Sequence, residues 1–462
     1  MRKAGGTQRN RPGIRRLRRD LALIAMMALG ASGAVRADLP EFSPASLDPN
    51  LFQGNLFQWI DFDPVDTHVS WPNPEDEDVP ARGWTPYVGA RSVYDANVFR
   101  LPAPGLVPVI PSVVSRNDVI NTVTAGVDTH WSVSGEGLEF LARADENRYA
   151  RNTYLDNTSG AAGLIGHWRF GSRFSGQAGA TYDRKLAEFG SYHELAQDFL
   201  LPKDIYNNYK FYATGHMALG SGWRLNAEAL EVKVTHTDDP LDKYTGAIGT
   251  LSVEYNTPGG SSLAVKYQAT NGHYGYPGFI NDVIPFNRNF HEQVSTAQIL
   301  VPLGSTVVAS ATGGYISHHY TVTTNFDFSG AIWDASLAFH STERTQLLLM
   351  SSRNVYAYVD AASEYFVSEA SRAIARWAPT AKLSVELQYS REDQRFIGPN
   401  PLSTALPFPQ HSLIRYEQID VAWSIARSLQ AVLYYRRANR DSNLSMFAFN
   451  DSLVSASLQA RF

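Results

Sequence analysis

Eight short turn sequences divide most of this chain into pairs of strand-like segments. The turns are at 134–137, 171–172, 220–222, 257–260, 302–305, 341–343, 378–380 and 426–428. Two runs of about 10–16 residues and one longer polar loop separate successive turns. Eight short turns and nine longer connections join eighteen strands, and this regular alternation is typical of an up-and-down antiparallel β-barrel in a membrane. A soluble β-sandwich has strands of typically 3–10 residues and no reason to separate short from long connections.

Within these runs, apolar and polar residues alternate with a period of two. In LSVELQY (383–389) every odd-numbered residue is apolar or aromatic, and every even-numbered residue is polar. The final stretch, SLVSASLQARF (452–462), has the same pattern and ends on Phe462. A period of two places alternate side chains on opposite faces of a strand. We therefore expect the apolar face to contact lipid and the polar face to line the lumen, with the last strand pairing with the first.

Two details refine this expectation. The alternation changes phase between Ala229 and Leu230, which predicts a β-bulge there. Several aromatic residues are predicted near strand ends, where the two bilayer interfaces favour amphipathic rings. These residues are Trp131, Trp168, Trp333, Trp377 and Tyr389.

The first 37 residues have the layout of a secretory signal peptide. A segment rich in Arg and Lys precedes the apolar run LALIAMMALGASGAV (21–35), and Val35-Arg36-Ala37 is a small-residue cleavage pattern. The apolar run is short for a spanning helix, which needs about 20 residues. We therefore predict export of the chain to the bacterial outer membrane. Since the chain contains no Cys, disulfides, lipid-modified Cys and thiolate metal sites are excluded.

Residues 38–83 differ from the rest of the chain. They include the acidic, Pro-rich stretch DFDPVDTHVSWPNPEDEDVPARG and show little periodicity, which predicts an irregular periplasmic segment. Residues 84–462 form the predicted barrel. Removing the nine Lys/Arg residues and the single acid of residues 1–37 leaves 31 basic and 44 acidic residues, a net charge of −13. A basic surface for nucleic acid is therefore absent.

The sequence shows no motif that carries enzyme chemistry. It lacks G-x-S-x-G, H-E-x-x-H, P-loop and dinucleotide-binding patterns. His318 and His319 are adjacent on one predicted strand, so they point to opposite faces and do not chelate one ion. We expect no catalytic residue, no cofactor and no metal, although a Ser, His and acid triad assembled from distant residues stays open as an alternative.

The charged residues on the predicted polar face are the candidates for a functional lumen. The cations are Arg143, Arg169, Lys210, Arg224, Lys266, Arg372, Arg376, Lys382 and Arg436, and the anions are Asp128, Glu139, Asp183, Glu228, Glu254, Glu386 and Asp420. One interpretation is cross-strand ion pairing that fills the pore wall. The other is a series of hydrogen-bonding groups for a hydrated polymer. An 18-stranded barrel is wide enough for an aqueous channel.

Two segments resemble a known family. YVGARSVYDANVFRLP (87–102) is similar to the opening strand of the putative beta-barrel porin family, with Asp95, Asn97 and Arg100 among the matching positions. The last 29 residues, 434–462, are similar to the end of the same family, with matches at Arg440, Ser442, Asn443, Phe449 and Asn450. The most similar members are the EpsL-type proteins of exosortase (PEP-CTERM) associated exopolysaccharide clusters. A C-terminal Phe, here Phe462, resembles the assembly signal that the barrel-assembly machinery reads in outer-membrane proteins.

This resemblance implies an outer-membrane component of exopolysaccharide biosynthesis or export, with outer-membrane lipid, exopolysaccharide and periplasmic export components as partners. Composition and periodicity do not themselves indicate a polysaccharide. A general or small-solute diffusion porin fits the predicted fold equally well. A barrel enzyme that acts on lipid or glycan is the third hypothesis.

Overall fold

The computed structural model describes residues 83–104, 113–133, 136–187, 189, 203–237, 243–275, 278–280, 284–322, 324–342, 344–357, 365–398 and 410–462. The predicted signal peptide and the acidic segment lie outside the described residues, except for Gly83. No helix in the described part of the chain is long and apolar enough to cross a membrane.

Eighteen strands form one antiparallel sheet, as the turn pattern predicts. They are β1 (Gly83–Asp95), β2 (Asp118–Val133), β3 (Glu136–Tyr149), β4 (Asn157–Phe170), β5 (Phe174–Leu186), β6 (Ile205–Gly220), β7 (Trp223–His236), β8 (Tyr244–Asn256), β9 (Ser262–Tyr274), β12 (Phe290–Pro302), β13 (Val307–Tyr320), β14 (Phe328–Thr342), β15 (Thr345–Ala357), β16 (Tyr365–Thr380), β17 (Leu383–Ile397), β18 (His411–Ala426), β19 (Leu429–Ser442) and β20 (Phe449–Arg461). The predicted short turns fall at or directly beside the junctions of consecutive strands. The end of the barrel that carries these turns is called the turn rim, and the opposite end the loop rim.

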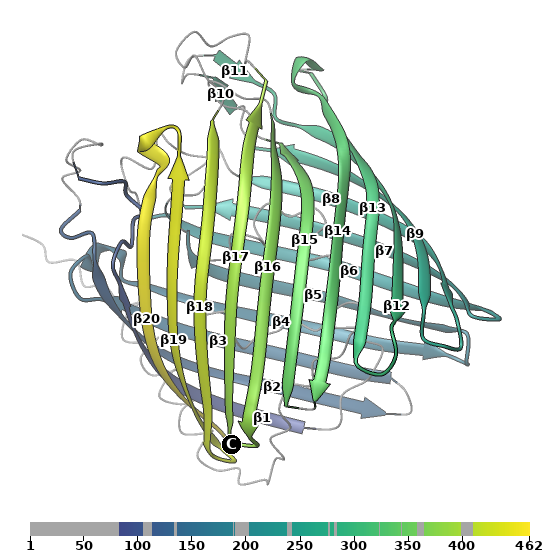
Figure 1. The fold of residues 1–462 in the computed structure, drawn as a ribbon, viewed down its shortest axis with the longest axis horizontal. Coiled ribbons are helices and arrows are strands. Elements are labelled where there is room, and N and C mark those ends of the chain that lie inside the picture. Colours follow the sequence, from purple (N-terminus) through teal and green to yellow (C-terminus); the bar gives the residue numbers. More distant parts are fainter. Residues whose placement is uncertain are drawn as a thin grey trace, which may run out of the picture.

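Shorter elements lie between the barrel strands. Three single-turn helices, η4 (Thr153–Leu155), η5 (Thr324–Phe326) and η6 (Ser445–Phe447), belong to connections at the loop rim. A small hairpin of β10 (Gly278–Ile280) and β11 (Ile284–Phe286), which the turn pattern does not predict, lies in the connection from β9 to β12 and projects above the loop rim (Figure 1).

The sheet closes on itself because β1 pairs with β20. The register runs from Tyr87 opposite Arg461 to Asp95 opposite Leu453. Beyond the strand, the backbone N–H of Phe462 donates to the carbonyl oxygen of Pro86 at 2.9 Å. Closure removes both edges of the sheet, so the backbone groups of all eighteen strands pair within the barrel.

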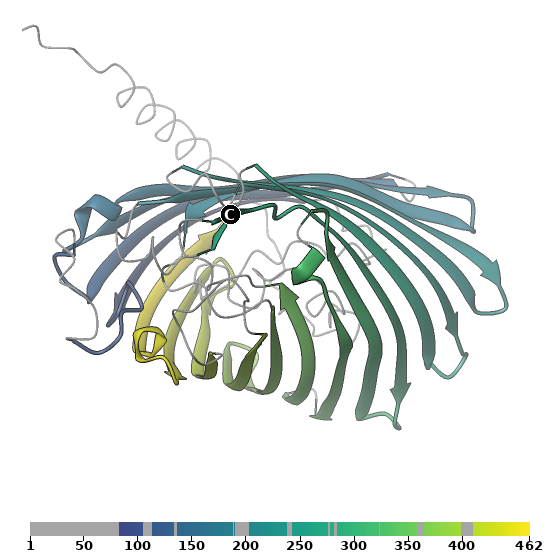
Figure 2. The ribbon, with the colours of Figure 1, turned by 90° about the horizontal axis from the view of Figure 1, so that it is seen from above.

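The closed sheet has a flattened outline. In Figure 1 the strands β13–β20 run steeply in front, and the strands of the other wall cross behind them at a large angle. Seen from above, the two walls enclose an interior that is broader than it is deep (Figure 2). The crossing reflects the tilt that strands adopt in any closed barrel.

The outward face is apolar over a continuous belt. On β17, for example, Leu387 and Tyr389 point outward and are 48% and 45% exposed. Exposed aromatic residues border the belt on both sides. On the turn rim side these are Trp84, Trp131, Phe174, Trp223, Trp377 and Trp423, and on the loop rim side Tyr94, Tyr315, Tyr389 and Tyr435. An apolar exterior with two aromatic borders is the surface that a bilayer requires, so this face contacts lipid.

The aromatic border on the loop rim side lies at mid-strand at Tyr315, Tyr389 and Tyr435, whereas Tyr94 is one residue from the end of β1. Tyr389 is the seventh of fifteen residues in β17, and Trp333 the sixth of fifteen in β14. The expectation that these two residues lie near strand ends is therefore wrong. The strands continue past the lipid on the loop rim side, because their alternation is maintained there with polar outward residues such as Arg391 and Arg395.

The predicted bulge between Ala229 and Leu230 is also absent. The register of β7 with β6 and with β8 is continuous through both residues. Leu230 simply points inward, followed on the same face by Val232 and Val234, which are 5% and 4% exposed. The pattern of apolar residues changes phase in the sequence because the inner face of β7 becomes apolar toward the loop rim, while the register of the strand does not change.

Glycines on the inner face make room for aromatic rings of neighbouring strands. A Cβ added at Gly126 would lie 2.3 Å from Cζ of Tyr87 and 2.8 Å from the carbonyl oxygen of Ala142. The ring of Tyr212 covers Gly179 in the same way, and the ring of Phe290 covers Gly272. These three rings therefore occupy the space that a side chain would fill at the glycine positions.

We predict that Gly126→Ala destabilises the barrel by roughly 1–3 kcal/mol, because the new methyl group displaces the Tyr87 ring and meets backbone that does not yield. Urea unfolding of the protein in lipid vesicles measures the change. Gly313→Ala is the matched control, since no atom lies within 4 Å of its added Cβ. Equal stability of the two variants would show that the ring does not need this space.

Candidate functional site: the inner wall and the closure seam

The register of the strands assigns each residue to the inward or the outward face of the barrel, because paired residues on neighbouring strands point to the same side. Most of the predicted lumen residues lie on the inward face of their strands. These are Arg143, Lys210, Arg224, Lys266, Arg372, Arg376 and Arg436 among the cations, and Asp128, Glu139, Asp183, Glu228, Glu254, Glu386 and Asp420 among the anions. Their role toward a solute stays a prediction.

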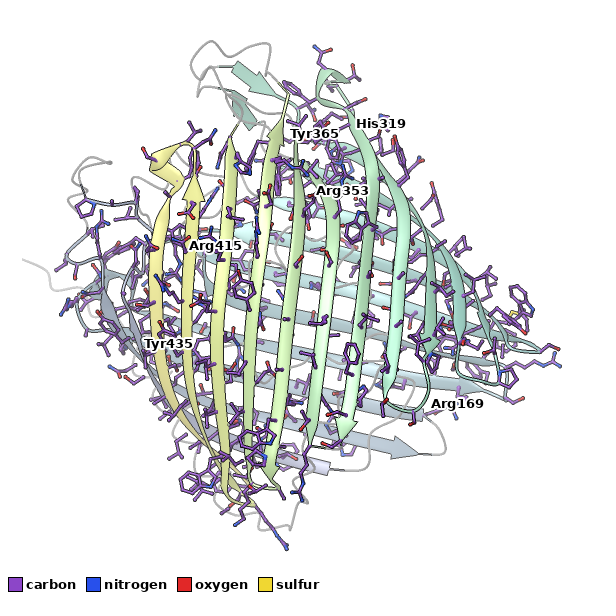
Figure 3. The ribbon with its side chains drawn as sticks, viewed as in Figure 1. Arg169, His319, Arg353, Tyr365, Arg415 and Tyr435 are labelled. Atoms are coloured by element: carbon purple, nitrogen blue, oxygen red, sulfur yellow. The ribbon has the colours of Figure 1, made fainter. Side chains whose placement is uncertain are left out.

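Two predicted lumen residues have different surroundings. Lys382 is not on a strand: it lies in the exposed turn between β16 and β17, because β16 continues to Thr380 and β17 begins only at Leu383. Arg169 is on the inward face of β4 but one residue from its end, and it is exposed at the turn rim (Figure 3). Neither side chain lines the middle of the barrel.

Ion pairs between neighbouring strands or along one strand account for several wall charges. Nε of Arg143 lies 3.0 Å from a carboxylate oxygen of Asp145, two residues along β3. Nε of Arg224 lies 3.8 Å from a carboxylate oxygen of Glu254 on β8. Nε of Arg376 lies 3.7 Å from a carboxylate oxygen of Glu386 on β17. These contacts favour the interpretation of wall filling at these positions.

Glu139 lies between two histidines of neighbouring strands. Its carboxylate oxygens are 3.6 Å from Nδ1 of His130 and 3.7 Å from Nε2 of His167. Glu139 and His167 are buried in the wall. Within the described residue ranges, no group of three His, Asp or Glu side chains is arranged to hold a metal ion.

Arg372 lies in a small pocket of the wall that β15–β18 form. The pocket is lined by the inward residues Met350, Ser352, Ala370, Arg372, Ser390, Glu392 and Tyr416, and by the outward-facing residues Ser351, Ser371 and Arg391 that alternate with them. Glu392 accepts hydrogen bonds from the Ser368 hydroxyl at 2.7 Å and from the Gln394 amide at 2.6 Å. The pocket thus presents a guanidinium fork, hydroxyl groups and one aromatic ring toward the lumen.

The closure seam brings together residues from the two ends of the barrel sequence. Nη1 of Arg100 lies 2.8 Å from one carboxylate oxygen of Asp451 and 3.3 Å from one of Asp95. Arg436 of β19 approaches the same Asp451 oxygen at 3.9 Å. The Asp451 side chain is fully buried. Two carboxylates and two guanidiniums therefore meet at the loop rim end of the β1–β20 pair.

Asn97, which follows β1, forms hydrogen bonds both to β20 and to the loop after β1. Its backbone N–H donates to Asp95 at 2.8 Å and to Asp451 at 3.1 Å. Its side-chain amide donates to the carbonyl oxygens of Leu101 at 2.8 Å and Asn450 at 3.1 Å. Arg100 has a φ of +52°, a left-handed conformation that this set of contacts maintains.

The two segments that carry the family resemblance therefore meet in space. Asp95, Asn97 and Arg100 contact Asp451, the residue after the matched Asn450. Asp451 itself was not among the sequence candidates. The signal that could have identified it is topological: motifs at the first and last strands of a closed sheet must lie side by side.

On the other side of β19, the matched residues bind the start of β18. Nε of Arg440 donates to the hydroxyl of Ser412 at 3.4 Å, and the Ser412 hydroxyl donates to that of Ser442 at 3.2 Å. The side-chain oxygen of Asn443 accepts from the backbone N–H of His411 at 2.8 Å. Of the matched residues, Arg440 is thus buried between β18 and β19 near the loop rim, whereas Asn443 and Asn450 are exposed.

No protein-family model matches the chain, and no curated protein matches it. Solved structures with a similar arrangement include two Pseudomonas aeruginosa proteins, OccK2 (OpdF) and OpdL. OccK2 has 10% sequence identity and a TM-score of 0.47, with 82% of this chain and 98% of that chain covered. OpdL has 11% identity and a TM-score of 0.45, with the same coverages. The siderophore receptor PirA of P. aeruginosa has 10% identity and a TM-score of 0.42, with 83% and 81% covered. At these values the likeness does not bear on function.

We predict that Asp451→Asn destabilises the barrel by about 3–5 kcal/mol, because it leaves the guanidiniums of Arg100 and Arg436 short of one buried counter-charge. Urea unfolding in lipid vesicles measures the loss. Asp441→Asn is the control, since Asp441 pairs with Arg415 at 3.1 Å on the exposed surface and should cost less than about 1 kcal/mol. Similar losses in both variants would contradict a special role for the seam.

Proposed function

We propose that this protein is an outer-membrane channel for polar, hydrated solutes. The observation that carries the proposal is the contrast between the two faces of one closed sheet. Outside is an apolar belt with aromatic borders. The inward face carries hydroxyl and amide side chains that are themselves largely buried, including Gln177, Thr214, Thr250, Gln268, Thr296, Thr312, Ser336, Ser352, Ser390 and Gln394. These groups offer hydrogen-bond donors and acceptors without adding a fixed charge.

The size of the barrel supports the same proposal. Barrels of 16–18 strands leave an aqueous channel in their interior. On the inner face, the rings of Tyr87, Tyr212 and Phe290 lie over glycines of neighbouring strands, whereas Phe366 and Phe396 stack on each other. The expected outer-membrane location, the signal peptide of residues 1–37 and the periplasmic segment of residues 38–83 are part of this proposal.

Among the wall charges, Arg372 is the best candidate for solute selection. Arg372 lies in the wall pocket, with Ser390 directly opposite on β17, Met350 opposite on β15 and Glu392 among the lining residues. Its guanidinium thus lies beside hydroxyl groups and a carboxylate. An anionic or hydroxylated solute would accept hydrogen bonds from this fork.

We predict that Arg372→Gln assembles normally and shifts ion selectivity toward cations, because it removes one positive charge from the channel wall. Reversal potentials in planar bilayers under a KCl gradient measure the shift. Ala375→Arg is the control on the opposite face of the same strand. It places a charge in the lipid belt, costs roughly 2–4 kcal/mol near the midplane, and should reduce assembly. Unchanged ion selectivity of Arg372→Gln would indicate that Arg372 only fills the wall and does not select solutes.

A second candidate function is passage of exopolysaccharide. The observation that favours it is that the two family-like segments, far apart in the sequence, form one buried cluster at the closure seam. The same resemblance makes exopolysaccharide and periplasmic export components the proposed partners. Assembly by the barrel-assembly machinery through Phe462 belongs to this proposal as well.

We predict under this second candidate that deleting the gene in the native bacterium removes polysaccharide from the cell surface and retains it inside the cell. Chemical assay of extracellular and periplasmic sugar measures both amounts, and complementation with the wild-type gene is the control. Unchanged surface polysaccharide together with slower uptake of small polar solutes would reject the second candidate and leave the first.

A further inference from the structure

Three arginines lie on the outward face directly above the lipid belt. Arg391 of β17 and Arg437 of β19 occupy the next outward position after Tyr389 and Tyr435, and Arg415 of β18 lies between them. These residues are called the arginine patch. Figure 3 shows Arg415 closer to the loop rim than Tyr435 on neighbouring strands of the front wall. The patch therefore begins where the aromatic border of the belt ends.

The geometry of the patch places like charges together. Arg391 and Arg415 are direct cross-strand partners on the same face. Directly opposite residues have Cβ atoms about 5 Å apart, and like charges at this spacing repel each other. Within the described residues, Arg391 and Arg437 have neither a hydrogen-bond nor an ion-pair partner. Arg415 donates to Asp441 at 3.1 Å and to the side-chain oxygen of Asn439 at 3.5 Å.

Acidic residues near the patch offset its positive charge only in part. Asp441 pairs with Arg415 alone, and Glu417 is an exposed residue directly opposite Arg437 without an ion pair to it within 4 Å. Closer to the loop rim, the outward charges are paired with one another. Glu369 contacts Arg353 and Arg395, and Asp393 contacts His411 at 3.1 Å. The cations that lack partners thus lie at the level of the lipid headgroups.

We infer that the arginine patch binds the phosphate-bearing headgroups of outer-leaflet lipid. Guanidinium forks match phosphate oxygens bidentately, and a phosphate between Arg391 and Arg415 offsets their repulsion. Tyr389 and Tyr435 lie at the depth where acyl chains meet headgroups, so a lipid seated against them carries its phosphate to the patch. This inference rests on the lipid-facing belt and is independent of the proposed channel activity.

The test uses the full barrel in detergent and lipid A with both phosphates as the probe. Native mass spectrometry counts the lipid A molecules bound to each barrel at increasing lipid concentration. The variant changes Arg391, Arg415 and Arg437 to Gln. Each cation near an anionic lipid contributes about a fivefold factor in affinity, so we expect binding to weaken roughly a hundredfold.

The matched control removes the same charge from the opposite wall. It changes Arg148, Arg184 and Lys233, three outward cations of β3, β5 and β7, to Gln. Arg148 pairs with Asp156 at 3.0 Å, Arg184 donates to Asn207 at 3.3 Å, and Lys233 lies between Tyr209 and Thr245. This control should bind lipid A as the wild type does. Equal losses in both triple variants would mean an effect of net charge and would overturn the inference.

Two further measurements test whether the patch recognises the phosphate groups of the lipid. Dephosphorylated lipid A should bind no better to the wild type than to the patch variant, and equal binding of both lipid forms by the wild type would overturn phosphate recognition. An excess of inorganic phosphate should leave lipid A bound, whereas full displacement would indicate a site for the free ion. If the triple variant does not fold, Glu417→Gln serves instead. It removes a nearby carboxylate and should tighten lipid A binding, and unchanged or weaker binding would contradict the inference.

Discussion

The requirement that every backbone N–H and C=O be hydrogen-bonded within the hydrocarbon layer governs this structure. An open sheet would expose two unpaired edges to lipid, and each unsatisfied group there costs several kcal/mol. The pairing of β1 with β20 removes both edges at once. The buried cluster of Asp95, Arg100 and Asp451 lies at the loop rim end of this pair, where the first and last strands leave the bilayer.

Closure also gives the two faces of the sheet different environments. The outward residues must suit lipid, its interfaces and its headgroups, and the inward residues must suit water and solutes. The two sets alternate along each strand, so each is free to vary without the other. Ala375 and Arg376 illustrate this point, because neighbours in the sequence serve a lipid contact and an ion pair with Glu386.

Period-two alternation and turn positions were enough to predict the eighteen strands and most of the inward residues. The other features of the structure depend on properties that the alternation of apolar and polar residues does not contain. Tyr389 lies mid-strand because polar alternation continues beyond the lipid, and Lys382 lies in a turn because β16 continues to Thr380. Leu230 and Val232 point inward although they are apolar, which misled the prediction of a bulge. Asp451 and the arginine patch depend on cross-strand register, which a single strand pattern does not contain.

The closing pair also sets the order of folding. Asn97 and Asp451 are bonded across 354 residues of sequence, so their contact belongs to the most non-local class in the sheet. Loop-closure entropy makes such contacts slow to form, and a fold that depends on them cannot be completed while the chain is still being made. The nascent strands must therefore be kept apart until β20 is available. The hairpins joined by short turns have local contacts, so we expect them to form before the first and last strands pair.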